Sequence, residues 1–515
     1  MNALRSDSLP APSAGAAESL AAIDMGSNSF RLEIAQLHRG QYKRQLYLKK
    51  TVRLGAGLDA DGMLTDEAMQ RGLDCLAGFA EHLRDFPAAR VRAVATQTLR
   101  EARNRNAFLA TAQKTLGHGI EVISGREEAR LIFAGVARLQ PSERPRLVID
   151  IGGRSTEMIL GLGRKPLKAE SFQIGSVSLS LRYFPDGRFT PEAFRAAQVA
   201  AGAELEEALN LFARERSQPV WQEALGSSGT VGAVSQLLAA SGVTDGSITP
   251  EALRWCIERC LAAGHMDALD LPGLKDDRRA VVGGGLCILY TLLTQFQIER
   301  LQPAKGALRQ GVVFDLAERL QASQGELSRG RDMRDQSVAA LQLRFGVDTE
   351  QAQRVQDLTL HLHQQLVPKA ERERQRELAW AARLHEIGMM VSHHDHHRHS
   401  AYLLAHVDAP GFSQNQLHRL GDLALGQRGG LRKLETELQD ETLLWQLLAL
   451  RLALIKCHAR QPIDVQAMRL QRDGDQVTVR MNEGWAEAHP RALYLLNEEL
   501  EAWRKLGRLK LVLQA

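Results

Sequence analysis

Apolar residues along the first 320 positions follow two alternating patterns. Short apolar runs at 20–23, 91–95, 120–123 and 147–149 predict buried strands, and 41–53 predicts another. Helical spacing of apolar residues predicts helices over 64–86, 106–116, 126–137 and 304–320. Glycine-rich turns at 226–230 and 281–285 each predict the start of a further helix, with an anion or nucleotide site or a simple cap as alternatives. Strands that alternate with helices are typical of an α/β fold.

Beyond position 320 the pattern changes. Polar and charged residues fill 321–335, and helical spacing follows at 338–345, 350–366, 371–387 and 413–425. A mixed segment at 464–481 and 492–513 predicts a small α+β region. We therefore expect a disordered tail at 1–19, α/β domains at 20–139 and 140–320, an all-α domain at 321–440 and a small α+β domain at 441–515.

One glycine-rich loop occurs twice, each time at the end of a predicted strand. Each copy is an Asp followed by a glycine- and hydroxyl-rich turn: Asp24 with Gly26, Ser27, Asn28 and Ser29, and Asp150 with Gly152, Gly153, Arg154, Ser155 and Thr156. The two aspartates are 150 − 24 = 126 positions apart, about the length of one domain. Either turn alone is compatible with an ordinary β-hairpin. Because the N–H groups and hydroxyls of such turns suit an anion, the matching pair predicts a cleft that holds phosphate from two sides.

Composition narrows the class of protein. Of 515 residues 44% are hydrophobic and the net charge is +4, which is ordinary for a globular protein and implies no large electrostatic field. The five cysteines are odd in number and scattered, as is typical of reduced thiols. No segment reads as a signal peptide or has the ~20 apolar residues of a membrane span. We expect a cytoplasmic protein without a nucleic-acid partner, and peripheral association with the inner membrane stays open.

Acidic residues near the two loops supply candidate catalytic groups. Glu128 lies in the first turn of a predicted helix after Ser124, where capping and helix-dipole roles are the alternative. If this helix returns to the cleft, Glu128 can deprotonate a water that attacks phosphorus. Asp150, Glu157 and Asp24 offer the oxygen ligands that Mg²⁺ prefers. Since no Cys or Ser lies beside a plausible base, we expect direct attack by water.

Basic residues near the loops have two interpretations. They can contact a polyanionic substrate or be solvated surface charges, and they are Arg100, Arg53, Lys49 and Lys50. The choice between these interpretations depends on the fold.

Six motifs together resemble one known family. They are 24–30, 98–100, 124–133, 150–157, 306–311 and 397–402, and they are similar to the exopolyphosphatase/guanosine pentaphosphate phosphohydrolase family of the actin, heat-shock ATPase and sugar-kinase superfamily. The resemblance implies two duplicated ribonuclease-H-like domains of the actin-like ATPase type. It also implies Mg²⁺, possible use of K⁺, and a homodimer. By motif position it makes Glu128 the catalytic base, Asp150 and Glu157 catalytic and metal-linked acids, and 26–29 and 152–156 the phosphate loops.

The second loop departs from the family pattern at one position. The family usually has a third glycine where this chain has Arg154. A positive φ there would strain the backbone by ~1 kcal/mol or more. The guanidinium can clamp a phosphate or turn outward to solvent, and the sequence leaves both open.

The predicted helical domain contains many histidines. His385-Glu386 precedes a dense cluster at 393–400, which in isolation suggests a metal site. The resemblance implies a domain similar to metal-dependent HD phosphohydrolases, in which a His-Asp pair holds metal. Because Glu386 replaces that Asp, we expect a structural relic with the histidines in hydrogen bonds. The basic run 427–433 either extends an electropositive channel or is a surface loop.

Four functions are compatible with these features. The first is an exopolyphosphatase that processively hydrolyses terminal phosphates of inorganic polyphosphate to orthophosphate. It is favoured by the long C-terminal half, the basic run and the segment 397–402. The alternative is a guanosine pentaphosphate 5′-phosphohydrolase. A non-catalytic nucleotide-binding regulator and a metal-dependent hydrolase in the helical domain follow.

Overall fold

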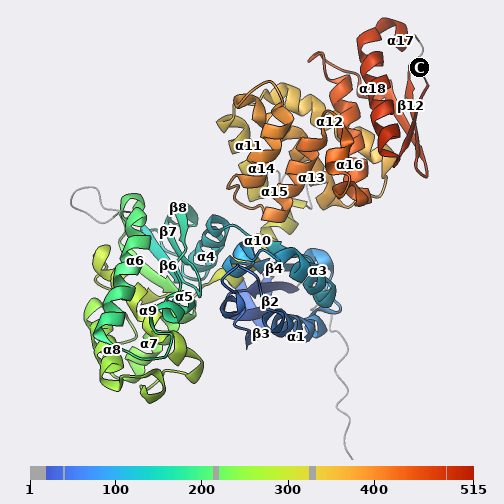
Figure 1. Ribbon diagram of the computed structural model, residues 1–515. Helices are drawn as coiled ribbons and strands as arrows, with labels where there is room; N and C mark the ends of the chain where they lie inside the picture. The colour runs from blue at the N-terminus through green and yellow to red at the C-terminus, as the bar shows by residue number, and fades with distance from the viewer. Residues whose placement is uncertain (1–18, 39–40, 213–219, 324–331, 483, 515) are drawn as a thin grey trace, which may run out of the picture. The chain divides into compact units, whose positions relative to one another are not determined.

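The computed structural model describes residues 19–38, 41–212, 220–323, 332–482 and 484–514. The predicted tail lies outside the described residues except for Ser19. The chain forms two compact units, Met1–Gln321 and Ala322–Ala515 (Figure 1). Among the described residues no helix has the length and apolar character needed to cross a membrane.

The first unit contains two five-stranded sheets with the same topology. The first has the order β3-β2-β1-β4-β5 and the second the order β8-β7-β6-β9-β10. In each sheet the first three strands are antiparallel and the fourth runs parallel to the first. The strands are β1 Ser19–Met25, β2 Ser29–His38, β3 Gln41–Thr51, β4 Val91–Ala95, β5 Ile120–Val122, β6 Arg146–Ile151, β7 Thr156–Leu162, β8 Lys165–Phe172, β9 Glu223–Ser227 and β10 Gln302–Pro303. The duplicated α/β architecture matches the sequence prediction.

Helices surround each sheet and complete two lobes. Figure 1 shows α1 and α3 in the first lobe and α5–α9 in the second. Each lobe has its own apolar core, and a third cluster joins the lobes through α4 and α10. The helices are α1 Asp66–Leu83, α2 Gln97–Glu101, α3 Arg105–Leu116, α4 Gly125–Leu139, α5 Ser176–Tyr183, α6 Pro191–Phe212, α7 Ser228–Ala240, α8 Pro250–Ala263, α9 Asp276–Gln295 and α10 Leu308–Ser323.

Glycines let α4 and α10 approach closely between the lobes. A Cβ at Gly311 would lie 1.7 Å from the carbonyl oxygen of Leu131, and one at Gly135 would lie 2.4 Å from that of Ala307. Any side chain at these positions would force the two backbones apart. The contact therefore joins the start of α10 to the middle of α4, the helix that carries Glu128 in its first turn.

One predicted helix start was wrong. The glycines at 281–285 do not open a helix; they lie inside α9, which begins at Asp276. A Cβ at Gly284 would lie 2.6 Å from the carbonyl oxygen of Ser176 on α5. These glycines therefore serve close packing of two helices, an effect that the local sequence does not show.

The second unit is mainly helical. Its helices are α11 Met333–Arg344, α12 Thr349–Leu366, α13 Arg372–Leu384, α14 His396–His406, α15 Gln414–Gly426, α16 Glu441–Lys456, α17 Trp485–Ala488 and α18 Pro490–Leu506. The strands β11 Met468–Asp473, β12 Gln476–Met481 and β13 Lys510–Gln514 form a small sheet. The spacing of apolar residues did not predict α14 or α16. One apolar core runs from Val338 to Leu511, across the boundary expected at 440.

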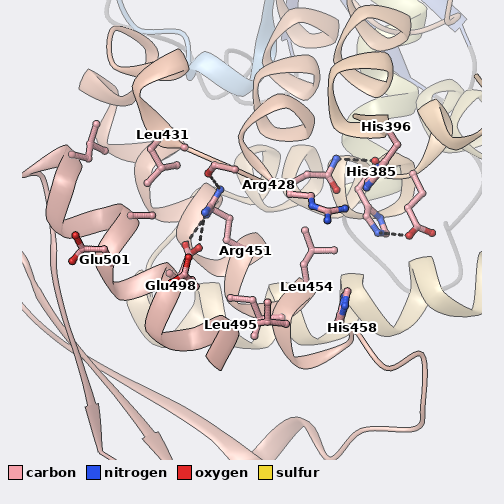
Figure 2. A pocket seen from close by; sticks show the side chains of 18 of the residues that line it. His385, His396, Arg428, Leu431, Arg451, Leu454, His458, Leu495, Glu498 and Glu501 are labelled. Atoms are coloured by element: carbon pink, nitrogen blue, oxygen red, sulfur yellow. Dashed lines mark hydrogen bonds and ion pairs between the residues drawn. The ribbon is translucent and has the colours of Figure 1, made fainter. Parts of the chain in front are cut away.

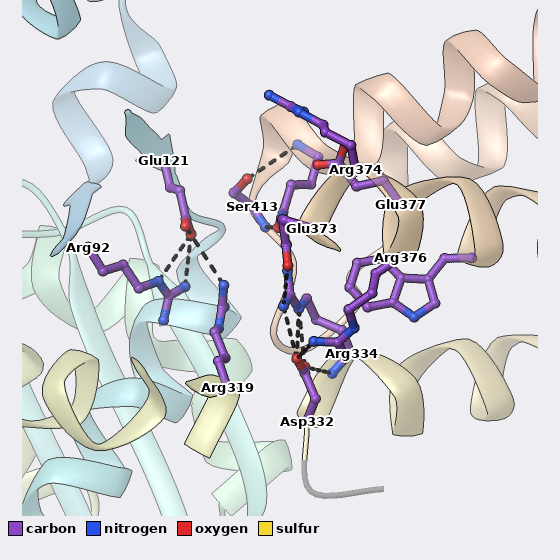
Figure 3. A network of polar contacts seen from close by, with 12 residues as sticks. Arg92, Glu121, Arg319, Asp332, Arg334, Glu373, Arg374, Arg376, Glu377 and Ser413 are labelled. Carbon is purple, nitrogen blue, oxygen red and sulfur yellow. Dashed lines mark hydrogen bonds and ion pairs between the residues drawn. The ribbon is translucent and has the colours of Figure 1, made fainter. Parts of the chain in front are cut away.

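Buried ion pairs fix the beginning of this unit. Figure 3 shows Asp332, the N-cap residue of α11, beside two guanidinium groups. Its Oδ2 lies 2.9 Å from Nη2 of Arg334 and 2.8 Å from Nη1 of Arg376 on α13. The two arginines in turn pack over the ring of Trp380. These contacts tie α11 to α13 at the edge of the core.

Candidate functional site

The two glycine-rich loops face each other across a cleft in the first unit. A Cβ on Gly153 would lie 3.2 Å from Cβ of Ser27 and 3.6 Å from the backbone nitrogen of Asn28. The cleft has a volume of about 360 Å³. Ten of the predicted site residues line it, namely Asp24, Gly26, Ser27, Asn28, Ser29, Glu128, Asp150, Gly152, Gly153 and Ser155. Ser29 is buried and its Oγ has no hydrogen-bond partner among the described residues, so this donor is free for a ligand.

The remaining predicted residues lie behind or away from the cleft. Arg100 lies behind Glu128, to which it donates a hydrogen bond. Thr156 is buried and its hydroxyl donates to the carbonyl of Ile174. Arg53 is exposed with a φ of 53° and does not line the cleft. The backbone N–H of Arg53 donates to the carbonyl of Asn28 at 2.9 Å, so the residue lies beside the first loop although it is not part of the cleft lining. Lys50 is also exposed and outside the lining.

Strand register explains where the acidic groups sit. In the first lobe Asp24 pairs across the hairpin with Arg31, and in the second Asp150 pairs with Glu157. The spacing is the same, 31 − 24 = 7 and 157 − 150 = 7. Directly paired residues project from the same face of a sheet. The first lobe therefore holds an ion pair, with Arg31 Nη1 2.8 Å from Asp24 Oδ2, whereas the second lobe holds two acids at the equivalent place.

Glu128 and its neighbour Glu127 divide two roles at the start of α4. Ser124 caps the helix by accepting a hydrogen bond from the backbone of Glu127. The side chain of Glu127 is buried and pairs with Arg130. The side chain of Glu128 instead lines the cleft, where its Oε2 is 2.8 Å from Nη1 of Arg100. The capping alternative thus does not account for Glu128.

Three carboxyl groups around the cleft have raised pKa values. Burial raises the pKa of Glu128 to about 7, although Arg100 opposes this, and Asp150 and Asp24 add to it. Burial also raises the pKa of Asp150 to about 6. Burial, Glu128 and Asp150 raise the pKa of Glu157. Glu128 and Asp150 line the cleft, whereas Glu157 is buried beside it and accepts a hydrogen bond from Ser171. Acids with such raised pKa values in a cleft are typical of functional sites.

The donor set suits a hard divalent cation in the second lobe. Asp150 and Glu157 are paired acids with oxygen ligands, and a cation would relieve their mutual repulsion. Asp24 is already paired with Arg31, which leaves it less available as a ligand. No group of three or more His, Cys, Asp or Glu side chains among the described residues is arranged to hold a metal. Mg²⁺ fits such a site, because it usually keeps several waters and binds through one or two carboxylates.

The sequence did not indicate most cations of the cleft. Six basic residues line it: Arg31, Arg44, Lys49, Arg278, Lys305 and Arg309. Of these, the sequence indicated only Lys49 as a candidate contact to the substrate. Arg309 is held by Glu33, which is fully buried in β2 and also accepts hydrogen bonds from Gln310. The position of Glu33 within an apolar strand is the one feature of the sequence that indicates this contact with Arg309, because buried charges need partners.

The turn at 226–230 opens a helix at the cleft, as its sequence predicted. α7 begins at Ser228, whose φ is 86° and whose hydroxyl donates to the carbonyl of Ile151. Ser227, Ser228, Gly229 and Thr230 line the cleft. The start of α7 therefore adds the partial positive charge of a helix N-terminus to the phosphate loops.

Arg154 forms a bridge between the two lobes. Its Nε donates to Glu101 Oε2 at 2.9 Å and its Nη1 to the carbonyl of Gly55 at 3.2 Å. Its φ is not positive, so the strain considered from the sequence does not arise. The guanidinium thus neither clamps the cleft nor turns to solvent. Gly175 accommodates this loop, since a Cβ there would lie 2.2 Å from the nitrogen of Arg154.

Comparisons with known proteins assign the chain to a class with this fold and this site. The duplicated sheets are those of the actin-like ATPase fold, and the two facing loops define a phosphohydrolase of that class. Residues 34–320 match the model of the Ppx/GppA phosphatase family, and residues 333–502 match domain III of Ppx/GppA phosphatases. The chain belongs to the Ppx/GppA phosphatase family.

Two curated relatives are similar over nearly their whole length. A guanosine-5′-triphosphate,3′-diphosphate pyrophosphatase of Pseudoalteromonas translucida (strain TAC 125) is 38% identical, with 95% of this chain and 97% of the relative covered. The protein of that name from Vibrio vulnificus (strain YJ016) is 37% identical, with 96% and 97% covered. The crystal structure of an exopolyphosphatase-like protein is 26% identical with a TM-score of 0.53, and covers 59% of this chain and 98% of its own.

These relatives correct the main functional prediction. The exopolyphosphatase interpretation was wrong at the level of substrate, because both near-full-length relatives are named for guanosine pentaphosphate. The long C-terminal half was one reason to favour polyphosphate. Since relatives named for the nucleotide have the same half, its length does not distinguish the two substrates. The basic run 427–433 and the segment 397–402 lie in the same C-terminal half, so they do not distinguish the two substrates either.

Proposed function

We propose that this protein hydrolyses the terminal 5′-phosphoanhydride of guanosine pentaphosphate. The observation that carries the proposal is the near-full-length similarity to two relatives named for that substrate. The cleft supports it, because two phosphate loops and a buried acid with a raised pKa meet there. A non-catalytic regulator would have no need of three buried acids around the loops. Metal-dependent hydrolysis in the second unit lacks a ligand group, since the described residues contain no cluster of three metal-binding side chains.

The proposed reaction is direct attack by water on the terminal phosphorus. Backbone N–H groups and hydroxyls of the two loops bind the phosphate oxygens, and Arg309 adds a cation at the cleft. Unprotonated Glu128 accepts a proton from the water, and Arg100 holds its carboxylate in place. A divalent cation on Asp150 and Glu157 would supply further charge neutralisation when bound. The use of K⁺, the homodimer and the likeness of the second unit to HD phosphohydrolases stay predictions.

Cations at the outer part of the cleft offer a place for the second phosphate group of the substrate. Lys49 pairs with Asp277 at 3.4 Å, whereas the Arg278 side chain has no hydrogen bond or ion pair with another described residue. Burial lowers the pKa of Arg278, and the nearby Asp277 only partly opposes this shift. Guanosine pentaphosphate carries a 3′-diphosphate besides its 5′-triphosphate. We propose that Arg278 contacts the 3′-diphosphate.

Substrate comparison tests the proposed function. We expect faster phosphate release per enzyme from guanosine pentaphosphate than from long-chain polyphosphate. Arg278→Gln should raise KM for the pentaphosphate by about 10-fold or more, because a charge-assisted hydrogen bond contributes about 1.5–3 kcal/mol. The same substitution should affect hydrolysis of GTP, which lacks the 3′-diphosphate, much less.

Arg279→Gln is the matched control. Arg279 lies next to Arg278 on α9, pairs with Asp276 and does not line the cleft. It should leave KM for both nucleotides unchanged. Preference for polyphosphate by the unaltered protein would contradict the proposed function, whereas equal effects of Arg278→Gln on GTP and pentaphosphate would contradict only the role of Arg278.

The pH profile tests the link between Arg100 and Glu128. Glu128 acts unprotonated, so kcat/KM should fall as the pH drops through its pKa of about 7. Arg100 lowers that pKa, and Arg100→Gln removes this effect. The acidic limb of the profile should therefore move to higher pH, with recovery of activity at alkaline pH. Arg103→Gln, at an exposed arginine nearby, should leave the limb in place. An unmoved limb in Arg100→Gln would show that another group titrates.

A further inference from the structure

The second unit contains a large pocket that shares no residue with the cleft. Its volume is about 910 Å³, within the range of small-molecule sites. All of its lining residues lie between positions 351 and 506. Figure 2 shows the pocket, with His385 and His396 at one end and residues of α16 and α18 on the facing wall. Nothing in the proposed hydrolysis uses these residues.

An unpaired cation points into this pocket. The side chain of Arg428 has no hydrogen bond or ion pair with another described residue. Figure 2 shows its guanidinium extending into the pocket toward His385. By contrast, the guanidinium of Arg451 on α16 is fully paired: its Nε and Nη2 each donate to the carboxylate of Glu499 at 2.6 Å, and its Nη1 donates to the carbonyl of Gly426. Arg428 is therefore a guanidinium of the pocket lining that is available to an anionic ligand.

Near Arg428 lies a buried ring nitrogen of His385 that accepts no hydrogen bond from the described residues. His385 is 1% exposed, and its Nδ1 lies 2.7 Å from the carbonyl oxygen of Ala382. A carbonyl only accepts, so Nδ1 carries the proton and Nε2 of the neutral ring is an acceptor. Burial lowers the pKa of His385, which favours the neutral ring. Nε2 has no hydrogen-bond partner among the described residues; the dashed line in Figure 2 joins it to Oε1 of Glu386 at 3.8 Å, which is too long for a hydrogen bond.

His385 Nε2 and Glu386 Oε1 are both hydrogen-bond acceptors, so a ligand with a hydrogen-bond donor fits between them. Glu386 is itself paired with Arg460, so its charge is already balanced. His396, 6% exposed, adds a second ring nitrogen, Nδ1, without a partner among the described residues. Buried polar atoms are nearly always satisfied in native proteins. A ligand hydroxyl that donates to His385 Nε2 would satisfy this end of the pocket.

The facing wall of the pocket is apolar. Leu454 and Ile455 of α16 and Leu495 of α18 line it, and Figure 2 shows Leu454 and Leu495 opposite Arg428. A ligand that fills the pocket thus needs three parts: an anionic group, hydroxyl donors and a flat or apolar body. Inorganic phosphate lacks the apolar body. A metal ion lacks a ligand group, since no cluster of three metal-binding side chains occurs among the described residues.

We propose that this pocket binds a nucleoside phosphate. Its phosphate contacts Arg428, its ribose hydroxyls donate to His385 Nε2 and Glu386, and its base lies against Leu454 and Leu495. The site is separate from the cleft and does not rest on the proposed hydrolysis. Arg428 suits the phosphate as a charge-assisted donor, and His385 and Glu386 suit the ribose as acceptors, which is why we infer a nucleoside phosphate.

Photocrosslinking of the full chain with 8-azidoguanosine diphosphate tests the proposal. Peptide mapping by mass spectrometry should find label in segments 385–396, 428–432, 454–460 or 495–506, besides any label in the cleft. The concentration dependence of label in these segments gives an apparent Kd for the pocket. Arg428→Gln should raise this Kd by about 10- to 100-fold. Since Arg428 is exposed, the substitution leaves the apolar core intact.

Controls separate the nucleoside phosphate from other ligands. Arg491→Gln, at an exposed arginine of α18 outside the pocket lining, should leave pocket labelling unchanged. Unlabelled GDP should displace the probe at far lower concentration than guanosine or orthophosphate. Label confined to the cleft, or pocket label unaffected by Arg428→Gln, overturns the proposal. Equal displacement by orthophosphate would show an anion site only, and retention of Zn²⁺ in dialysis that is lost in His385→Gln would show a metal site; either result also overturns it.

Discussion

Replacement of Glu128 by Gln should reduce kcat for guanosine pentaphosphate by about 100- to 10,000-fold, the usual contribution of a general base. This is about 3–5 kcal/mol of transition-state stabilisation. The amide keeps the size of the side chain and its place beside Arg100 but cannot take the proton from water. KM should stay the same or fall, because the substitution removes a negative charge from a site for phosphate. Phosphate release under saturating substrate measures the effect.

Two controls isolate the chemistry of Glu128 from stability. Glu192→Gln changes an exposed acid of α6 and should leave kcat unchanged. Thermal unfolding of Glu128→Gln should show no loss of stability. Burial disfavours the charged form of this acid, and its raised pKa means that protonated Glu128 suits the fold at least as well. A kcat within a few-fold of the unaltered protein would exclude Glu128 as the base.

Replacement of Asp315 by Asn should destabilise the first unit by about 3–5 kcal/mol, the cost of removing one partner from a buried ion network. Asp315 on α10 is 5% exposed and accepts from Arg130 of α4 at 2.6 Å, Arg92 of β4 at 2.6 Å and Arg319 at 2.7 Å. Figure 3 shows Arg92 and Arg319 converging on Glu121, a half-buried acid at the edge of this network. The substitution removes the acid that all three arginines share and leaves their charges to be balanced by Glu121 and Glu127 alone. Denaturant unfolding of the first unit measures the loss.

The pH dependence of stability gives an independent test of Asp315. Its three arginines hold the pKa of this carboxyl well below the usual range, against the effect of burial. The stability that it contributes is therefore present above the pKa of an unfolded aspartate, about 4, and is lost as the pH falls toward the folded value. Asp315→Asn should flatten this acid limb. Glu318→Gln, at a half-exposed acid of α10 paired with Arg138, should change stability by less than about 0.5 kcal/mol. A similar loss in both variants would contradict the role of the network.

Local patterns predicted the elements well where they depend on neighbours in sequence. The expected strand at 91–95 and the helix at 106–116 agree with β4 and α3 to within a residue. The duplicated loops lie on equivalent hairpins, because an Asp, a turn and a return strand are encoded within about ten positions. Patterns failed where apolar residues surround an element on all sides. α16 has no polar face, so the period that reveals an amphipathic helix is weak there.

The candidate site shows the same division. Glu128, Asp150 and the two loops could be selected from motif and position, and the structure places them at one cleft. Arg53 lies beside the first loop but does not line the cleft, and the sequence did not predict Arg278 or Arg309 as site residues. Arg309 owes its position to Glu33, which precedes it by 276 positions. No local pattern reports a contact across that separation.

By itself the sequence determined two lobes of one design and an acid at the end of the leading strand in each, because hairpin register is set within seven positions. The same local register places Arg31 opposite Asp24 and Glu157 opposite Asp150. Only the tertiary structure decided which other groups surround these acids, because the return of α4 brings Glu128 close to them. The pKa of a carboxyl group depends on every charge within a few ångströms, wherever that charge lies in the chain. The protonation of the acids in the cleft is therefore set only by the folded structure.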